Sequence, residues 1–95
     1  MAKKVQKKET GKKRTTFTFE AAWADEVILM GDFNNWDAKK HPMKKDKAGI
    51  WKKTAILSPG RYEYKFLVNG QWENDPENDQ TSVNCFGTQN NIINI

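Results

Sequence analysis

The sequence predicts an all-β fold, specifically an antiparallel β-sandwich, from three observations. Its 95 residues suffice for one domain with a single small core and leave no room for a second domain. Short segments of strand composition recur along the chain, with turn signals between them. No segment sustains the helical period of about 3.6 residues, and short strands joined by turns are typical of sandwiches.

Two strands are expected in the first third of the chain. Residues 16–20 (TFTFE) alternate polar and apolar side chains, which indicates a half-buried strand. After a turn at residues 23–25, residues 26–30 (EVILM) form a short apolar run that suits a central strand. Residues 31–37 are rich in Asn, Asp and Gly and are therefore expected to form a loop.

The middle of the chain combines a charged connection with a third strand. Residues 38–48 contain five Lys and one Pro, which predicts an exposed connection. Residues 50–57 return to strand composition. Residues 58–61 (SPGR) suit a type II turn, in which Pro fixes φ at the second position and Gly accepts a positive φ at the third.

The clearest strand is predicted at residues 62–68. Alternation along it separates a face with Tyr62, Tyr64, Phe66 and Val68 from a face with Glu63, Lys65 and Leu67. Asn69-Gly70 is a strong hairpin signal, so the residues that follow should return antiparallel. Residues 73–82 are acidic and Asn-rich and are expected to form a loop, and residues 91–95 should form a short final strand.

Positive charge is concentrated at the N-terminus. The net charge is +4, yet residues 1–14 hold seven of the 16 basic residues and only one of the 12 acids. We therefore expect a disordered basic tail at residues 1–12 and a folded domain at residues 13–95. The acidic balance of the domain argues against nucleic acid as its ligand. The tail is interpreted as a solubilising leader, with weak salt-sensitive contact to an anionic surface as the alternative.

Cysteine content and hydropathy exclude several classes of protein. The single cysteine, Cys85, cannot form an internal disulfide, which argues against a disulfide-stabilised secreted domain. The longest apolar run, residues 27–30, is far too short to span a bilayer. No apolar segment follows the charged N-terminus as it would in a secretory signal. We therefore expect a cytoplasmic protein with no membrane partner.

The sequence offers no convincing catalytic or metal-binding pattern. Its one histidine, His41, lies in a Lys-rich segment and is expected to be a solvated loop residue. Cys85 is expected to be a small, buried or half-buried thiol rather than a nucleophile. Acids alternate along residues 75–79, but Gln80 and Phe86 stand where a calcium loop requires Gly and Glu. The expectation is a protein that is not an enzyme and holds no metal or cofactor.

The four tryptophans suggest two kinds of role. Trp51 opens an apolar strand and is assigned to the core, whereas Trp23 lies at a turn and is expected to be a half-exposed cover for the core. Trp36 and Trp72 are flanked by polar residues, which makes complete burial improbable. Exposed indole rings are flat platforms for the apolar face of a sugar, and Lys65 with the Asn-rich loops can bond its hydroxyls. Purely structural roles for these rings are the alternative.

Four segments together resemble a known family. They are residues 31–36 (GDFNNW), 64–72 (YKFLVNGQW), 75–76 (DP) and 87–93 (GTQNNII). In this order they are similar to glycogen-binding domains, which are carbohydrate-binding modules of family forty-eight, the early-set, isoamylase N-terminal type. Such domains occur in the beta subunit of AMP-activated protein kinase and before the catalytic barrel of branching and debranching enzymes. The resemblance covers roughly residues 15–95.

The resemblance implies an immunoglobulin-like β-sandwich that binds α-1,4-glucans such as glycogen, starch or maltooligosaccharides without catalysis. The carbohydrate-binding residues implied by position are Trp36, Lys65, Trp72, Phe86, Thr88 and Asn90. The two tryptophans correspond to stacking residues, Lys65 and Asn90 to residues that bond sugar hydroxyls, and Thr88 to a neighbouring polar contact. Phe86 corresponds to an apolar residue, often Leu in related domains, that contacts the curved glucan.

The implied partners are an α-glucan and a glucan-metabolising enzyme. Two alternatives remain open beside a free-standing binding module. One is an accessory or regulatory module of a glycoside hydrolase or glucan-branching system. The other is a protein-interaction module. Trp23, at a position where relatives usually carry Pro or a small polar residue, has no role in any of these interpretations.

Overall fold

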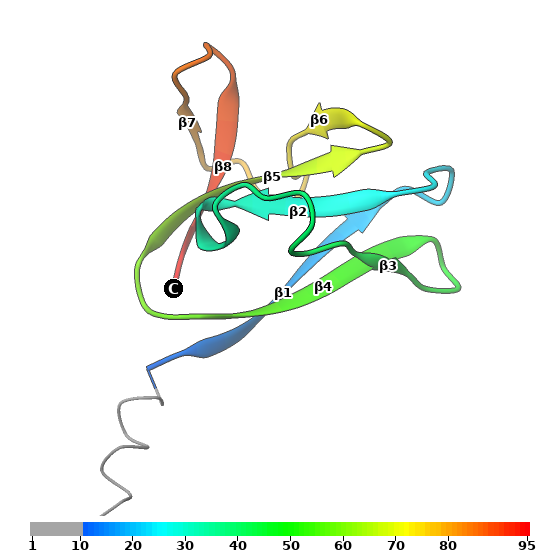
Figure 1. Ribbon diagram of the computed structural model, residues 1–95, viewed down its shortest axis with the longest axis horizontal. Coiled ribbons are helices and arrows are strands. Elements are labelled where there is room, and N and C mark those ends of the chain that lie inside the picture. Colours follow the sequence, from blue (N-terminus) through cyan, green and yellow to red (C-terminus); the bar gives the residue numbers. More distant parts are fainter. Residues whose placement is uncertain (1–10) are drawn as a thin grey trace, which may run out of the picture.

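A computed structural model describes residues 11–95, which form two antiparallel β-sheets (Figure 1). The predicted all-β sandwich is thereby confirmed. The basic tail expected at residues 1–12 lies outside the described residues, except for Gly11 and Lys12. In the described part of the chain, no helix is long and apolar enough to cross a membrane.

The first sheet has three strands in the order β1-β4-β3. Their bounds are Lys13–Glu20 for β1, Ile50–Leu57 for β4 and Lys44–Lys45 for β3. β1 and β4 pair antiparallel along their whole lengths. The alternation predicted in the first strand is confirmed, because Phe17 is buried while Thr16 and Thr18 are exposed.

The second sheet has the strand order β2-β5-β8-β7, and β6 also pairs with β5. The bounds are Val27–Gly31 for β2, Arg61–Val68 for β5, Gln71–Glu73 for β6, Thr81–Val83 for β7 and Gln89–Asn94 for β8. β8 pairs with residues 61–64 of β5 and β6 pairs with residues 66–68. Two strands therefore follow one another along the same edge of β5, and Lys65 lies at the junction between them.

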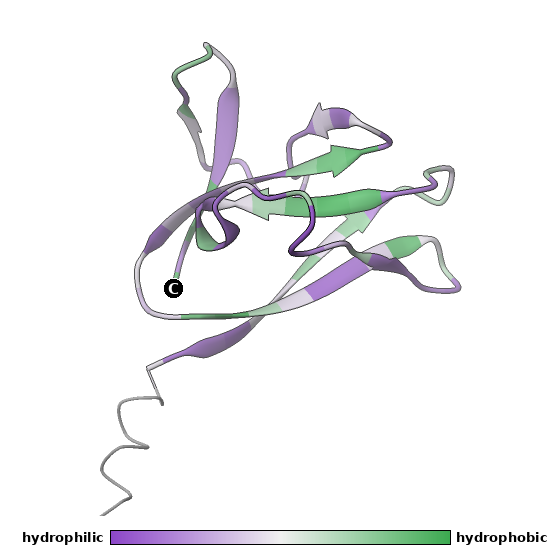
Figure 2. Cartoon of the chain, in the orientation of Figure 1, coloured by the Kyte–Doolittle hydropathy of each residue, from purple (hydrophilic) through white to green (hydrophobic). Residues whose placement is uncertain are grey.

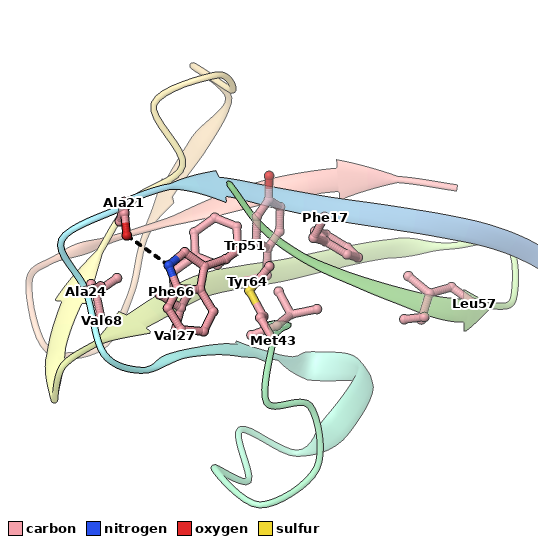
Figure 3. Packing of buried hydrophobic residues seen from close by; sticks show 12 residues of the cluster. Phe17, Ala21, Ala24, Val27, Met43, Trp51, Leu57, Tyr64, Phe66 and Val68 are labelled. Atoms are coloured by element: carbon pink, nitrogen blue, oxygen red, sulfur yellow. Dashed lines mark hydrogen bonds between the residues drawn. The ribbon is translucent and has the colours of Figure 1, made fainter. Parts of the chain in front are cut away.

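The core fills the space between the two sheets (Figure 3). Phe66 and Leu29 are fully buried, and complete burial of such a side chain contributes about 1.5–3 kcal/mol. The ring of Tyr64 contacts the rings of Phe17 and Phe66 at centroid distances of 5.0 and 5.9 Å. Trp51 is buried as predicted, and its indole N–H donates to the carbonyl of Ala21 at 2.9 Å.

β2 is buried along all five residues, as expected of a central strand, and is strongly hydrophobic in Figure 2. It nevertheless lies at the end of the strand order, and its free edge is covered by residues 41–43. The amide of Leu29 donates to the carbonyl of His41 at 3.0 Å, and the amide of Met43 donates to the carbonyl of Val27 at 2.9 Å. The expectation of an exposed connection over residues 38–48 is therefore wrong in part, because Met43 belongs to the core.

Two turns differ in how well the sequence predicts them. Asn69 and Gly70 have φ of 49° and 83°, which fits the left-handed conformations of a type I′ hairpin, so the predicted hairpin is confirmed. Gly60 has φ of 154° rather than the value near 80° of a type II turn. That prediction is wrong because the segment crosses between sheets, and Gly60 exchanges two backbone hydrogen bonds with Ile95.

The last third of the chain contains more strand than the sequence predicts. The composition of residues 73–82 predicts a loop, but β6 reaches Glu73 and β7 begins at Thr81. β8 begins at Gln89, two positions before the expected start of the final strand at residue 91. β7 and β8 form a hairpin that projects from the body of the sheet in Figure 1.

Candidate functional site

A cleft of about 370 Å³ lies on the outer face of the second sheet. Its lining residues are Asp32, Trp36, Lys65, Trp72, Asn84, Cys85, Phe86, Thr88 and Asn90. All six residues expected to form a binding site therefore line one cleft, although they come from four separate parts of the chain. Asp32, Asn84 and Cys85 also line it and were not singled out from the sequence as site residues.

Lys65 forms the floor of the cleft. As predicted, alternation along β5 turns it away from the core residues Tyr64 and Phe66. It is nevertheless only 7% exposed, which excludes an ordinary solvated lysine. Its ammonium donates to the hydroxyl of Thr88 at 3.2 Å and lies 5.9 Å from the ring centroid of Trp72, within cation–π range.

Trp36 and Trp72 form one aromatic wall. Their ring centroids are 6.2 Å apart, and the planes are inclined by 66°. Trp72 is 50% exposed, because its position on the short strand β6 directs it to the outer face beside Leu67. Trp36 is half-buried and follows the short 3-10 helix η1, Asp32–Asn34. The rings therefore present two differently oriented planes to the cleft.

The loop that carries Trp36 is held in an uncommon conformation. Asn35 and Trp36 both have φ of 56°, a left-handed region that bulky residues rarely adopt. The side-chain carbonyl of Asn34 accepts from the amides of Gly31 and Trp36, both at 3.1 Å. Such strain persists only where surrounding contacts enforce it, and it concentrates at functional sites.

Asp32 fixes the ring of Trp36 directly. One carboxylate oxygen accepts the indole N–H of Trp36 at 3.0 Å, and the other accepts the backbone amide of Glu63 at 2.9 Å. The carboxylate thus joins the loop to β5 and sets the plane of the indole. The sequence shows an Asp four positions before a Trp, but such a residue in a loop ordinarily indicates only a turn.

His41 supports the same loop from the other side. The amide orientation of Asn34 is set by the two backbone donors at its oxygen, so its nitrogen donates to the carbonyl of Leu29 at 3.0 Å and to Nδ1 of His41 at 2.8 Å. Burial, with Lys53 and Lys40 nearby, lowers the pKa of His41 below its ordinary value. The expectation of a freely solvated loop histidine is wrong.

The far wall of the cleft is the loop between β7 and β8. Phe86 at its tip is 85% exposed, and Gly87 has φ of 84°. Thr88 is exposed, whereas Asn90 is only 7% exposed. Cys85 is exposed, so the prediction of a buried or half-buried thiol is wrong, because Cys85 shares the projecting loop with Phe86.

Trp23 lies outside the cleft. It is 69% exposed, so the expected half-exposed cover for the core is wrong. Its loop is nevertheless well anchored, because the amide of Asp25 donates to the side chain of Asn69 at 2.9 Å and the ammonium of Lys45 donates to the carbonyl of Ala22 at 3.0 Å. The structure gives no contact that explains why an indole stands at this position.

The acidic segment at residues 75–79 is tied to the sheet. The carboxylate of Asp75 accepts the hydroxyl of Tyr64 at 2.8 Å and the amide of Glu77 at 2.9 Å. Burial raises the pKa of Tyr64, so its phenol stays protonated and donates this bond. Within residues 11–95, no group of three or more His, Cys, Asp or Glu side chains is arranged to hold a metal ion.

The fold and the cleft define the class of protein. A sheet face that carries one exposed and one half-buried indole ring together with a few placed donors is the site of a binding module. The family described as the glycogen recognition site of AMP-activated protein kinase matches residues 13–95. The chain belongs to this family, and the resemblance seen in its motifs is confirmed.

Relatives of this chain include plant proteins and kinase subunits. The chloroplastic protein FLOURY ENDOSPERM 6 of Oryza sativa subsp. japonica is 37% identical over 82 residues, which are 86% of this chain and 15% of that protein. The chloroplastic PTST homolog 2 of Arabidopsis thaliana is 40% identical over 70 residues, 74% of this chain and 13% of that protein. Subunit beta-1 of 5'-AMP-activated protein kinase from Sus scrofa is 37% identical over 93 residues, 96% of this chain and 71% of that sequence. The chain thus spans only a small part of the length of the two plant proteins.

Proposed function

We propose that this domain binds α-1,4-linked glucan on the outer face of its second sheet, by stacking glucose rings on Trp36 and Trp72. The observation that carries the proposal is the 66° inclination of the two indole planes, at a centroid distance of 6.2 Å. Successive rings of an α-1,4-glucan turn relative to one another, so inclined planes suit them. A flat β-1,4-linked chain would instead require coplanar platforms.

Polar groups beside the rings supply the remaining contacts. The ammonium of Lys65 and the hydroxyl of Thr88 lie together at the floor of the cleft, 3.2 Å apart. Both can bond sugar hydroxyls while the indole rings cover the apolar faces of the same sugars. Phe86, which is 85% exposed at the loop tip, supports the proposal as an apolar contact for the concave side of a curved glucan.

The binding is proposed to be modest in affinity and without catalysis. The cleft is open and small, so the contact area must offset the entropy lost on association. The carboxylates of Asp32 and Asp75 are engaged in hydrogen bonds that hold the loops. Pure protein incubated with amylopectin should release no reducing sugar, and measured release would contradict this part of the proposal.

The direct test is a tryptophan fluorescence titration with β-cyclodextrin, a cyclic α-1,4-glucan, with cellobiose as the flat control. Stacking on Trp36 and Trp72 should give a saturable change with β-cyclodextrin and none with cellobiose. Equal responses to the two sugars would contradict selection for a curved chain. The absence of any response at millimolar β-cyclodextrin would remove the proposed function.

A second role is favoured by the placement of this family within longer chains. The chain covers 15% and 13% of the two plant relatives, so the shared domain is one part of those proteins. We propose that the domain brings an associated glucan-metabolising enzyme to its polymer. Co-sedimentation with insoluble starch, with and without soluble maltoheptaose as competitor, should show capture of the domain together with that enzyme.

The proposed compartment is the reducing cytoplasm. The exposed free thiol of Cys85 lies in the cleft, where oxidation or mixed-disulfide formation would obstruct a ligand. Cell fractionation with an antibody against the domain tests this placement. Recovery in an oxidising compartment would contradict it.

A further inference from the structure

Asn84, between β7 and β8, makes four side-chain hydrogen bonds inside the cleft wall. Its carbonyl oxygen accepts from the backbone amides of Phe86 at 2.9 Å and Thr88 at 3.1 Å. Its amide nitrogen donates to the hydroxyl of Thr88 at 2.8 Å and to the side-chain oxygen of Asn90 at 3.0 Å. Because backbone amides can only donate, they hold the carbonyl oxygen of Asn84 and so leave its amide nitrogen facing the hydroxyl of Thr88.

As a result, the hydroxyl of Thr88 can act toward a ligand only as a hydrogen-bond donor. A hydroxyl oxygen accepts through two lone pairs and donates one proton. The amide nitrogen of Asn84 and the ammonium of Lys65 occupy both lone pairs, at 2.8 and 3.2 Å. Among residues 11–95, no side chain or carbonyl accepts the proton, and Thr88 lines the cleft.

Lys65 has the same polarity. An ammonium group carries three protons and no acceptor, and one of these protons is directed to Thr88. Within the described range, no carboxylate lies at ion-pair distance from this ammonium, although the residue is only 7% exposed. The floor of the cleft therefore consists of two adjacent groups that can donate hydrogen bonds to a ligand but cannot accept them.

The arrangement is anchored at its far end by β5. The amide nitrogen of Asn90 donates to one carboxylate oxygen of Glu63 at 3.0 Å, and the other oxygen accepts from Arg61 at 3.0 Å. From the backbone of the loop through Asn84 and Asn90, every bond thus points toward the carboxylate of Glu63, which also accepts from Arg61 on its other side. Exchanging donor and acceptor at the side-chain amide of Asn84 or Asn90 would require the backbone amides of the loop to accept hydrogen bonds. Backbone amides can only donate, so the orientation of both side chains is fixed.

We propose that Asn84 is a positioning residue that fixes the Thr88 hydroxyl as a donor, so that Thr88 and Lys65 recognise a ligand oxygen only as an acceptor. The inference rests on the proposed function and deepens it, because it assigns the polarity with which this corner meets a sugar hydroxyl. A ligand group whose only capacity is to donate should be rejected there, because it would face two donors without an acceptor.

Asn84→Asp tests the polarity with little change of shape. One carboxylate oxygen can still accept from the amides of Phe86 and Thr88, but the other would face Thr88 as an acceptor. The Thr88 proton would then turn inward and be lost to the ligand. Calorimetric titration with β-cyclodextrin should give affinity weakened roughly tenfold, the typical effect of losing one hydrogen bond of this kind. Asn94→Asp, at the exposed C-terminal end of β8, adds the same charge outside the cleft and should bind normally.

Thr88 variants test the same hydroxyl directly and keep the proposal testable if Asn84→Asp fails to fold. Thr88→Val keeps the shape and loses the hydroxyl, and should weaken binding roughly tenfold, whereas Thr88→Ser should restore binding. In the Asn84→Asp background, Thr88→Val should change affinity less than about twofold, because the proton is already withdrawn from the ligand. A merely structural role for Asn84 predicts independent losses that multiply.

The outcomes separate the two claims. If the wild-type domain binds β-cyclodextrin but folded Thr88→Val or Asn84→Asp binds equally well, the inference about polarity is overturned and the proposed function stands. Multiplying losses in the double variant overturn the positioning role in the same way. If the wild-type domain does not bind β-cyclodextrin, both are overturned. Urea unfolding midpoints of each variant show whether the fold is retained.

Discussion

Trp72 is the residue on which the proposed site most directly depends. It is 50% exposed and faces the cleft, so its removal takes away a binding surface while leaving the core intact. Trp72→Ala and Trp36→Ala should each weaken β-cyclodextrin binding at least about tenfold, as aromatic hot-spot residues do. Trp23→Ala is the matched control, because that indole is exposed outside the cleft. Unchanged affinity in folded Trp72→Ala would contradict the site.

His41 makes the domain sensitive to mild acid. Its pKa is lowered by burial and then by Lys53 and Lys40 from an ordinary value of 6.5. Below about that pH the unfolded chain binds this proton while the folded domain resists it, so stability should fall as pH falls. Asp46, whose pKa is lowered from 3.8, contributes stability that is lost only in stronger acid. The urea midpoint should therefore decrease between pH 7.5 and pH 5, and less so in His41→Gln.

The individual residues show what a sequence can and cannot reveal. Trp36 and Trp72 stand out because large rings amid polar neighbours are unusual, and Lys65 follows from strand alternation. Asp32 and Asn84 do not stand out, because Asp and Asn are common in any loop. Their importance comes from partners such as Glu63 and Asn90, which only the paired strands bring near them.

At the scale of elements, strands with a strong hydrophobic pattern are predictable and short polar strands are not. β4 carries buried side chains at alternate positions, as do the core residues Tyr64, Phe66 and Val68 of β5, and the sequence places both strands almost to the residue. β7 has only three residues and none is buried, so nothing in its composition separates it from loop. It is a strand because β8 offers it a backbone partner. The sequence likewise does not predict that the edge of β2 is covered, because the covering residues 41–43 have the composition of an exposed connection.

Substitutions at two turn glycines distinguish the cost of backbone strain from the cost of steric crowding. Gly70 and Gly49 have nearly equal φ of 83° and 85°, but a Cβ at Gly70 meets no atom within 4 Å, whereas one at Gly49 would lie 2.5 Å from Cβ of Ala22. Gly70→Ala should cost about 1–2 kcal/mol of stability through strain alone. Gly49→Ala should cost at least about 1 kcal/mol more. Urea unfolding measures both, and equal losses would contradict the crowding at Gly49.

At the scale of the whole molecule, the residues that line the cleft within the described range 11–95 all fall between Asp32 and Asn90. Deleting residues 1–12 should therefore leave β-cyclodextrin affinity unchanged, while any salt-sensitive binding to nucleic acid should fall with the loss of the five basic residues in that segment. Calorimetry and a salt series on the two proteins compare these effects. A marked loss of glucan affinity in the shortened protein would place part of the site in the tail.

The succession of β6 and β8 along one edge of β5 has a thermodynamic consequence. A sugar chain resting on Trp72 and against Phe86 would bridge two arms that meet β5 at separate places, and the unfolded chain offers no such pair. Ligand would therefore act as a reversible crosslink, and by mass action it would add about 2.7 kcal/mol to folding stability at a hundred times its dissociation constant. A domain resident on its polymer would outlast free copies in the presence of a protease, so the polymer itself would set how long each copy survives.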